Sequence, residues 1–438
     1  MGHRIHFLVL CAWLFSAGAW AEDKPVKQAP NEDATAKEAP ADTIWNRDHL
    51  FGDWGGLRTS LADHGVYVDL RLTQVFQAVT SGGVDTGSAY GGVMDYIINV
   101  DAEKLGLWKG LAFNVHAQTR YGKDISALAG PLTLATTPLL YPLPGDYHGT
   151  NITGAAVYQA FNEGKFQAFA GKLHALDLVQ GIFPGTTHEG VGGFMNVNAL
   201  VTAMPWFRYI NLSQWGGGFW SVEGGLPKAG LVILGQDNTT TSWSMRNSFN
   251  EGVGFLAFYK HSYQINGKDG FVMGFAGGST KGYPSLNPDN WEFIPGEGIV
   301  STVKKKPMDV AGYIYQVLWK GTGTQDIHLL MGTTLGDNDP NFSNWSTFAS
   351  VEAYGVIGSR RHDRMGVSFW YTGITRNVKD LTAITLGRDT VNLWGVELYY
   401  NYQISPWLHL SADLQFLQNT DKDDDVAIVP GVRLVMDF

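Results

Sequence analysis

The dominant pattern along the chain is a strict alternation of apolar and polar residues over stretches of about ten residues. The stretch LHLSADLQFLQ, Leu408 to Gln418, is an example. Its apolar positions are Leu408, Leu410, Ala412, Leu414 and Phe416, with Leu417 as the exception among the residues between them. A period of two places successive side chains on opposite faces of a β-strand. The pattern therefore predicts a strand with one apolar and one polar face.

The same alternation recurs along the whole chain after residue 65. It predicts about sixteen strands, each near the length that a tilted strand needs to cross a bilayer. The predicted strands are 66–79, 91–104, 111–121, 153–162, 165–174, 215–224, 229–236, 252–262, 270–278, 309–319, 325–335, 346–356, 363–373, 391–402, 408–417 and 428–438.

The connections between these strands alternate in length. Those after odd-numbered strands are mostly long, such as 122–152 and 175–214, and those after even-numbered strands are short, such as Glu163–Gly164. Long loops at one end and short turns at the other are typical of outer-membrane barrels. A soluble sandwich shows the same alternation within its strands, so the period alone does not decide. Together with the leader described next, the pattern predicts an all-β, transmembrane, antiparallel up-and-down barrel with lipid outside and water inside.

The N-terminus predicts export. Residues 1–21 have His3 and Arg4, an apolar run and then Ala19-Trp20-Ala21, as in a signal peptide cleaved after Ala21. Residues 22–44 are rich in Ala, Pro and charged residues and predict a disordered periplasmic tail, which leaves 45–438 as the barrel domain. No run of about 20 apolar residues follows the leader.

Composition narrows the partners. The net charge of −10 argues against nucleic acid as a partner. The single cysteine lies in the leader, so no disulfide is expected in the exported chain. His-Glu-x-x-His, phosphate-binding and nucleophile-elbow motifs are absent from the sequence, which predicts no enzyme, cofactor or metal site. The acidic run Asp421 to Asp425 lacks calcium-loop spacing and is interpreted as a charged loop.

Several segments resemble the carbohydrate-selective OprB porins. They are LFGDWGGLRTSLADHGVYVDL (Leu50 to Leu70), the Gly91-Gly92 pair, VDAEKLGLWKGLAF (Val100 to Phe113), NVNALVTAMP and the closing VRLVMDF. The resemblance spans residues 45–438. It implies a sixteen-stranded outer-membrane barrel that passes monosaccharides, especially glucose, inward by diffusion. It assigns no individual sugar-binding residue.

A short helix is predicted before the first strand. Asp53 is a suitable N-cap for residues 54–64, and Gly65 is a suitable stop. The helix is expected at the periplasmic mouth or inside the lumen, where it either anchors the barrel or contacts solute.

Strand parity selects ten residues that should face the lumen near mid-height. They are Arg71, Asn99, His116, Gln118, Arg120, Lys172, Glu352, Trp370, Glu397 and Asp413. Their charges are of both signs, which suits a neutral polyol better than an ion. Each is alternatively part of a solvated wall or of a salt bridge across the barrel, and Trp370 is alternatively packed against a loop folded inward.

The remaining expectations concern loops and partners. The apolar, proline-rich segment 128–145 is expected to pack inside the barrel or on other loops, or else to contact lipopolysaccharide or a neighbouring protomer. The C-terminal Phe438 is expected to engage the barrel-assembly machinery. The expected surroundings are outer-membrane lipid, and a homo-oligomer is left open.

Three functions compete. The first is a diffusion porin for sugars. The second is a porin of the same fold for another small polar or hydroxylated acidic solute, which Arg71, Arg120 and Lys172 would suit. The third is a barrel enzyme such as a lipase or protease, for which the sequence offers no motif.

Overall fold

The computed structural model describes residues 43–140, 148–183, 191–202 and 204–438. These residues form a closed antiparallel barrel of sixteen strands in which each strand pairs with its neighbours in sequence and β1 pairs with β20. The strands are β1 (Val66–Val79), β2 (Gly87–Asp101), β3 (Leu111–Gly122), β4 (Gly149–Phe161), β5 (Phe166–His174), β6 (Ser213–Glu223), β7 (Leu226–Leu234), β8 (Gly254–Ile265), β9 (Lys268–Ser279), β14 (Met308–Lys320), β15 (Asp326–Gly336), β16 (Ser343–Tyr354), β17 (Arg364–Ile374), β18 (Leu393–Ser405), β19 (Leu408–Gln418) and β20 (Ala427–Asp437). All sixteen predicted strands are confirmed. The predicted leader 1–21 and almost all of the predicted tail lie outside the described residues.

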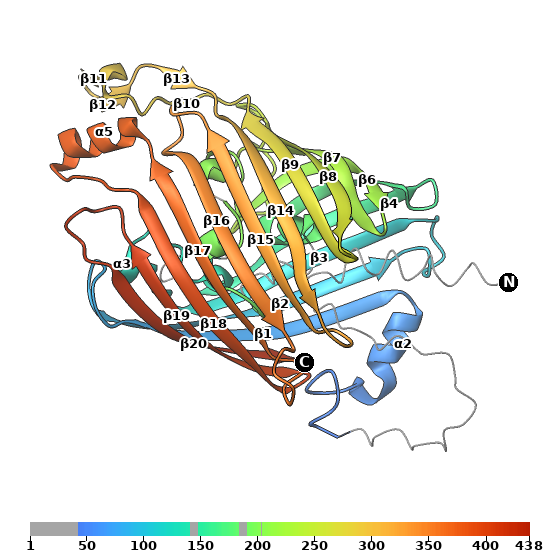
Figure 1. Ribbon diagram of the computed structural model, residues 1–438. Coiled ribbons are helices and arrows are strands. Elements are labelled where there is room, and N and C mark those ends of the chain that lie inside the picture. Colours follow the sequence, from blue (N-terminus) through green and yellow to red (C-terminus); the bar gives the residue numbers. More distant parts are fainter. Residues whose placement is uncertain (1–42, 141–147, 184–190, 203) are drawn as a thin grey trace, which may run out of the picture.

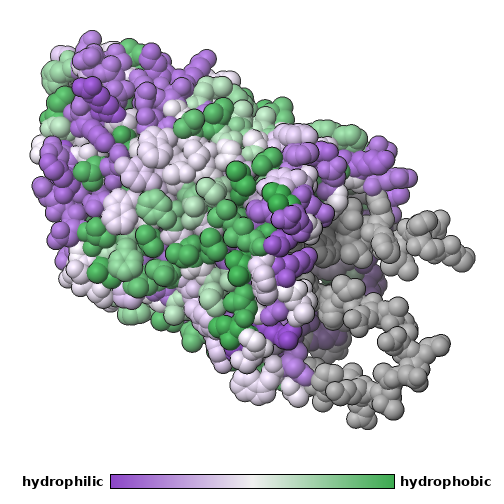
Figure 2. Space-filling view, in the orientation of Figure 1, coloured by the Kyte–Doolittle hydropathy of each residue, from purple (hydrophilic) through white to green (hydrophobic). Residues whose placement is uncertain are grey.

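The two faces of each strand meet different surroundings. In β19 the outward Leu410 is 39% exposed, whereas the inward His409 and Gln415 are buried. In Figure 2 the side chains of the visible wall form a largely apolar zone between hydrophilic ends. This distribution is that of a barrel with lipid around it. No helix in the described ranges has the length and apolar character that a membrane span requires.

The two ends of the barrel differ. One end carries the long loops with α5 (Arg376–Leu386) and the short strand pairs β10 (Tyr283–Pro284) with β13 (Lys304–Lys305) and β11 (Trp291–Ile294) with β12 (Gly298–Ser301). The other end carries the short turns, the C-terminus and α2 (Leu57–Asp63), as Figure 1 shows. The predicted asymmetry of loops and turns is therefore present.

The segment before β1 clamps the C-terminus. It contains the 3₁₀ turn η1 (Trp54–Gly56) and then α2, which together cover the predicted helix. Asp53 accepts a hydrogen bond from the Thr59 backbone, 2.7 Å, and Gly65 follows the helix with φ +86° where a Cβ would meet the Asp101 carbonyl. Arg58 donates to the carbonyls of Val68 and Phe438. The helix lies beside the short-turn end of the barrel (Figure 1).

The same segment covers an aromatic residue beside the last turn of the barrel, Trp407, between β18 and β19. Trp407 is 7% exposed, and its indole N–H donates to the carbonyl of Ile44, 2.6 Å. Trp108, Trp319 and Tyr402 remain exposed at strand ends, as interfacial aromatics are.

Two long loops fold into the lumen. The first includes α3 (Ser126–Ala129) and η2 (Thr137–Leu139); the second includes α4 (Ala175–Ile182), η4 (Val197–Ala199) and η5 (Met204–Arg208). Backbone hydrogen bonds join the loops, for example from Thr137 N–H to Met195 O at 2.7 Å. Residues 191–202 are buried throughout. The described part of segment 128–145, up to Leu140, packs largely inside the barrel, one of the alternatives predicted for it.

Candidate functional site in the lumen

The lumen has a packed part and an open part. Toward the long-loop end the inward side chains of the strands are buried against the two loops, as with Tyr313, Phe348 and Trp370. Toward the short-turn end several inward side chains stay partly exposed, among them Tyr67, Asn114 and Arg364. Solute entering from the short-turn end therefore meets an open vestibule first.

Two of the ten predicted lumen residues belong to a polar cluster that holds the second loop. The Glu397 carboxylate accepts from the backbone N–H groups of Met195 and Asn196. Asp413 accepts from Gln415, 2.9 Å, and Gln415 in turn accepts from Asn196, 3.1 Å. These buried acids fix a loop rather than face open lumen.

Five more of the predicted residues face inward and are engaged within the wall. The pairs are Arg71 with Asp437 at 2.8 Å, Asn99 with Asn114 at 2.8 Å, Gln118 with Asp95 at 2.7 Å, Arg120 with Asp124 at 3.1 Å, and Glu352 with Tyr399 at 2.6 Å. All five are buried. These contacts are the salt bridges and wall contacts that were predicted as alternatives to solute binding.

Trp370 points inward but lies out of reach of solute. It is 0% exposed and belongs to the apolar cluster that contains Val197 and Leu200 of the second loop. Its ring occupies the space that a Cβ on Gly395 would need. Trp370 is therefore a packing residue at the base of the inward loop.

Lys172 does not face the lumen, and the prediction for it is wrong. Lys172 pairs with Ala155 and Trp215, whose side chains lie on the outer face of the wall. Its ammonium donates to the carbonyls of Ile152 and Ser242 and lies 5.6 Å from the ring of Trp243. A loop covers the outer face at this place, so a lysine is buried there without entering the lumen.

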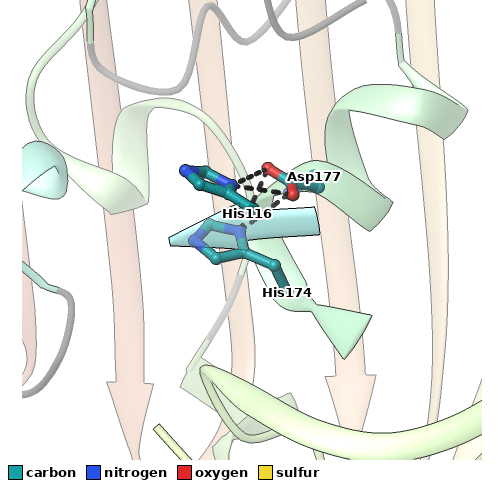
Figure 3. A group of neighbouring side chains, drawn as sticks. All are labelled: His116, His174 and Asp177. Atoms are coloured by element: carbon teal, nitrogen blue, oxygen red, sulfur yellow. Dashed lines mark hydrogen bonds and ion pairs between the residues drawn. The ribbon is translucent and has the colours of Figure 1, made fainter. Parts of the chain in front are cut away.

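His116 is the predicted residue with the most connected surroundings. Its Nε2 lies 3.0 Å from Asp95, and its Nδ1 lies 2.9 Å from Asp177 of α4. His174, at the end of β5, stacks on His116 with ring centroids 4.5 Å apart and places its Nδ1 3.1 Å from Asp177 (Figure 3). Sequence reasoning missed His174 and Asp177 because they lie about sixty positions from His116.

Asp177 links this cluster to the open lumen. Its side chain is 30% exposed, and the neighbouring Leu178 and Val179 of α4 are also partly exposed. Burial alone would raise the pKa of Asp177, but the nearby His116 and His174 lower it below its ordinary value. The carboxylate is therefore ionised at neutral pH, and its exposed part presents negative charge to water.

An aromatic surface in the vestibule was also missed. Phe271 of β9 and Tyr315 of β14 face inward, stack with centroids 5.2 Å apart and are partly exposed. Tyr158 of β4 is also partly exposed and stacks on Phe169 at 5.5 Å. The ammonium of Lys260 lies 5.8 Å from the Phe271 ring. The strand alternation around 270–278 and 309–319 could have identified Phe271 and Tyr315, because both share parity with buried inward residues.

The acidic run at 421–425 serves as a loop contact. Asp421 pairs with Arg388 at 2.8 Å, and Lys422 pairs with Asp389 at 3.2 Å. These contacts fit the interpretation of the run as a charged loop.

Comparison with known proteins finds a family model that matches part of the chain. The family model for the carbohydrate-selective porins of the OprB family matches residues 304–438. No curated protein matches the chain in sequence.

Solved structures extend the likeness over the whole barrel. The high-pH structure of Pseudomonas putida OprB is 16% identical, covers 91% of this chain and 100% of its own, and superposes with a TM-score of 0.73. The low-pH structure of the same protein is 15% identical, covers 90% of this chain and 99% of its own, and has a TM-score of 0.56. At this identity the likeness is one of fold. The chain is thus a porin-fold barrel whose residues 304–438 match the carbohydrate-selective OprB porin family, which confirms the resemblance seen in its sequence.

Proposed function

We propose that this chain is an outer-membrane porin through which monosaccharides such as glucose diffuse passively into the periplasm. The observation that carries the proposal is the vestibule, where partly exposed aromatic rings stand near charges of both signs. The family match over residues 304–438 supports sugar as the class of solute. We further propose that residues 1–21 direct export and are removed after Ala21.

The chemistry of a sugar fits these groups. A hexose has apolar C–H faces and a rim of hydroxyl groups, so it needs a flat apolar surface together with donors and acceptors. The stacked pair Phe271 and Tyr315 offers the surface. Lys260 beside it and Asp177 at α4 offer a donor and an acceptor.

The aromatic pair lies across the barrel from the polar wall of β1 to β3. Strands β9 and β14 lie about half-way round the closed barrel from β1 and β2. A solute that touches Phe271 and Tyr315 therefore has the polar wall of β1 to β3 across from it. We infer that a sugar presents its ring to one wall and its hydroxyls to the other.

A second candidate is a porin for a small hydroxylated acid. Lys260 and Arg364 both face inward in the short-turn half and would attract a carboxylate. We do not assign catalysis to the barrel, because its family and fold are those of porins.

The experiment that tests the proposal is a liposome-swelling series. Vesicles with the purified porin should swell fastest in glucose and more slowly in disaccharides. A small carboxylate of similar size should enter no faster than glucose. Faster entry of the carboxylate would favour the second candidate, and equal rates for all solutes would contradict selectivity.

A matched pair of variants tests the aromatic surface. Phe271→Ala removes a ring from the vestibule, whereas Phe369→Ala removes one from the outer face, where Phe369 is 47% exposed. We expect Phe271→Ala to lower glucose flux several-fold relative to ion conductance. We expect Phe369→Ala to leave that ratio unchanged.

A further inference from the structure

The cluster at α4 places three potential metal ligands together. His116 Nδ1, His174 Nδ1 and a carboxylate oxygen of Asp177 lie within 4.8 Å of one another. In the ranges that the structure describes, this is the one group of three or more histidine, cysteine or acidic side chains with that spacing. Figure 3 shows both imidazole rings facing the same carboxylate.

Both nitrogens of His116 lie against carboxylates, Nε2 against Asp95 at 3.0 Å and Nδ1 against Asp177 at 2.9 Å. Asp95 accepts from Gln118 at 2.7 Å, and it accepts the N–H of His116 Nε2 when that nitrogen carries the hydrogen of a neutral ring. In neutral imidazole only one nitrogen carries hydrogen, so Nδ1 then points a lone pair at Asp177. A carboxylate that orients a histidine through its far nitrogen is the usual outer contact of a metal-binding histidine.

His174 also has a ring nitrogen with a lone pair beside Asp177. Its Nδ1 accepts from the backbone N–H of Asp177 at 3.2 Å and therefore carries a lone pair. The same nitrogen lies 3.1 Å from Asp177 Oδ1. Two nitrogen lone pairs beside one carboxylate require positive charge among them. A proton on His116 would supply it for one nitrogen, whereas a cation in the middle would supply it for both.

We propose that His116, His174 and Asp177 bind a divalent transition metal ion of the Zn²⁺ class. Two histidines and one carboxylate are a common ligand set for this ion, with a fourth position left to water. Asp177 Oδ1 lies 3.2 Å from His116 Nδ1 and 3.1 Å from His174 Nδ1, close to the roughly 3.3 Å edge of a tetrahedron with bonds of about 2.0–2.1 Å. The partly exposed side of Asp177 gives the ion and its water access from the lumen.

Because the ligands come from three elements, a bound ion would hold those elements together. His116 lies on β3, His174 ends β5, and Asp177 lies on α4, the part of the inward loop that borders open lumen. A bound ion would join α4 to the wall and add positive charge beside the partly exposed Asp177. Metal binding should therefore alter conductance as well as stability.

The test is zinc titration of the folded, detergent-solubilised protein, purified without a histidine tag. Isothermal titration should show one saturable site in the wild type, and dialysis should leave about one zinc per chain. His174→Gln and Asp177→Asn should abolish that site. Asp95→Asn, which removes only the orienting carboxylate, should weaken binding about 10- to 100-fold.

His328→Gln is the matched control. His328 is also a buried lumen histidine, 2.8 Å from Asp326 and opposite Glu352, but these three do not have the ligand spacing of the His116 group. Its loss should leave zinc affinity unchanged. In planar bilayers micromolar zinc should reduce wild-type conductance and leave the Asp177→Asn channel unaffected.

The outcomes are distinct. No retained zinc and no saturable heat in the wild type would mean that a proton alone bridges the cluster, and the proposal would be overturned. Binding that survives both His174→Gln and Asp177→Asn would also overturn it. Should these variants fail to fold, zinc-edge X-ray absorption of the wild type decides: two imidazole ligands support the site, and their absence refutes it. Glucose flux in zinc-free protein is a separate measurement, so failure here leaves the porin proposal intact.

Discussion

The packed and open parts of the lumen are built from the same strands but use their inward residues differently. Toward the long-loop end, Glu397, Arg433 and Trp370 are fully buried against loop segments. Toward the short-turn end, Phe271 and Tyr315 keep part of their surface in contact with water. An inward position in a barrel is therefore not by itself a solute-binding position. An inward side chain can contact solute only where no loop folds back to cover it.

The sharpest test of this difference is one substitution made in both parts. Phe348→Ala in the packed part should cost about 4 kcal/mol, because Phe348 is 1% exposed and its loss leaves a cavity. Phe271→Ala should cost about half as much or less, since part of its ring is already hydrated. Urea unfolding in lipid vesicles measures both. Equal losses would show that the vestibule is as tightly packed as the loop contacts.

Arg433→Leu should disrupt the packed part almost as strongly. Arg433 donates to the Gly193 carbonyl at 2.9 Å and to Ser411 at 2.8 Å, with Glu397 and Asp413 as its nearby charges. Removing one member of a buried charged group leaves the others uncompensated, which costs about 3 kcal/mol or more. The expected signature is a lower unfolding midpoint together with larger, noisier single-channel currents. A stable variant with wild-type currents would argue against this anchoring role.

Glu397→Gln is a milder change at the same loop. The amide keeps one acceptor oxygen but loses the second, so one of the two backbone N–H groups at Met195 and Asn196 loses its partner. The expected cost is about 1–3 kcal/mol. Glu223→Gln, at the exposed short-turn end, is the control and should cost far less. Hydrogen exchange of residues 193–197 should rise only in the Glu397 variant.

The smallest effect is expected at the clamp beside the vestibule and depends on pH. Burial, reinforced by Arg58, lowers the pKa of His49, whose Nε2 lies 3.3 Å from the Arg58 guanidinium. Because the folded pKa lies below the unfolded value of about 6.5, this contact stabilises the clamp fully above that pH. The stabilisation is lost as pH falls through the folded pKa. Protease cleavage between residues 43 and 58 should increase in acid, and His49→Gln should remove the pH dependence.

The barrel could be predicted well from the sequence, because lipid outside and water inside impose an alternation of apolar and polar residues on each strand. Strand ends were predicted to within four residues, even though Trp215 to Trp220 includes three consecutive glycines. Lys172 was misplaced because Phe166 and Phe169 lie on opposite faces of the same strand, so apolar character did not distinguish the two sides. The helices α4, in an inward loop, and α5, at the long-loop end, were not predicted, since loop residues there face no regular boundary between lipid and water.

The candidate site was harder to predict for a different reason. Parity identified residues that point inward, such as Glu397 and Asp413, but it carries no information on which loop lies above them. The His116 partners His174 and Asp177 come together only because the chain turns inward after β5. Contacts of this kind depend on the three-dimensional path of a loop, and no local period encodes that path.

The bond between Arg58 and the final carbonyl, at Phe438, spans 380 positions of sequence. Leu50 adds a second such bond to Asp437, 2.8 Å, directly beside the seam where β1 meets β20. These acceptors come together with their donors only once the first and last strands have met, so the clamp forms at the end of folding. It should therefore slow the unfolding of the completed barrel without speeding its folding, and so lengthen the lifetime of the folded state.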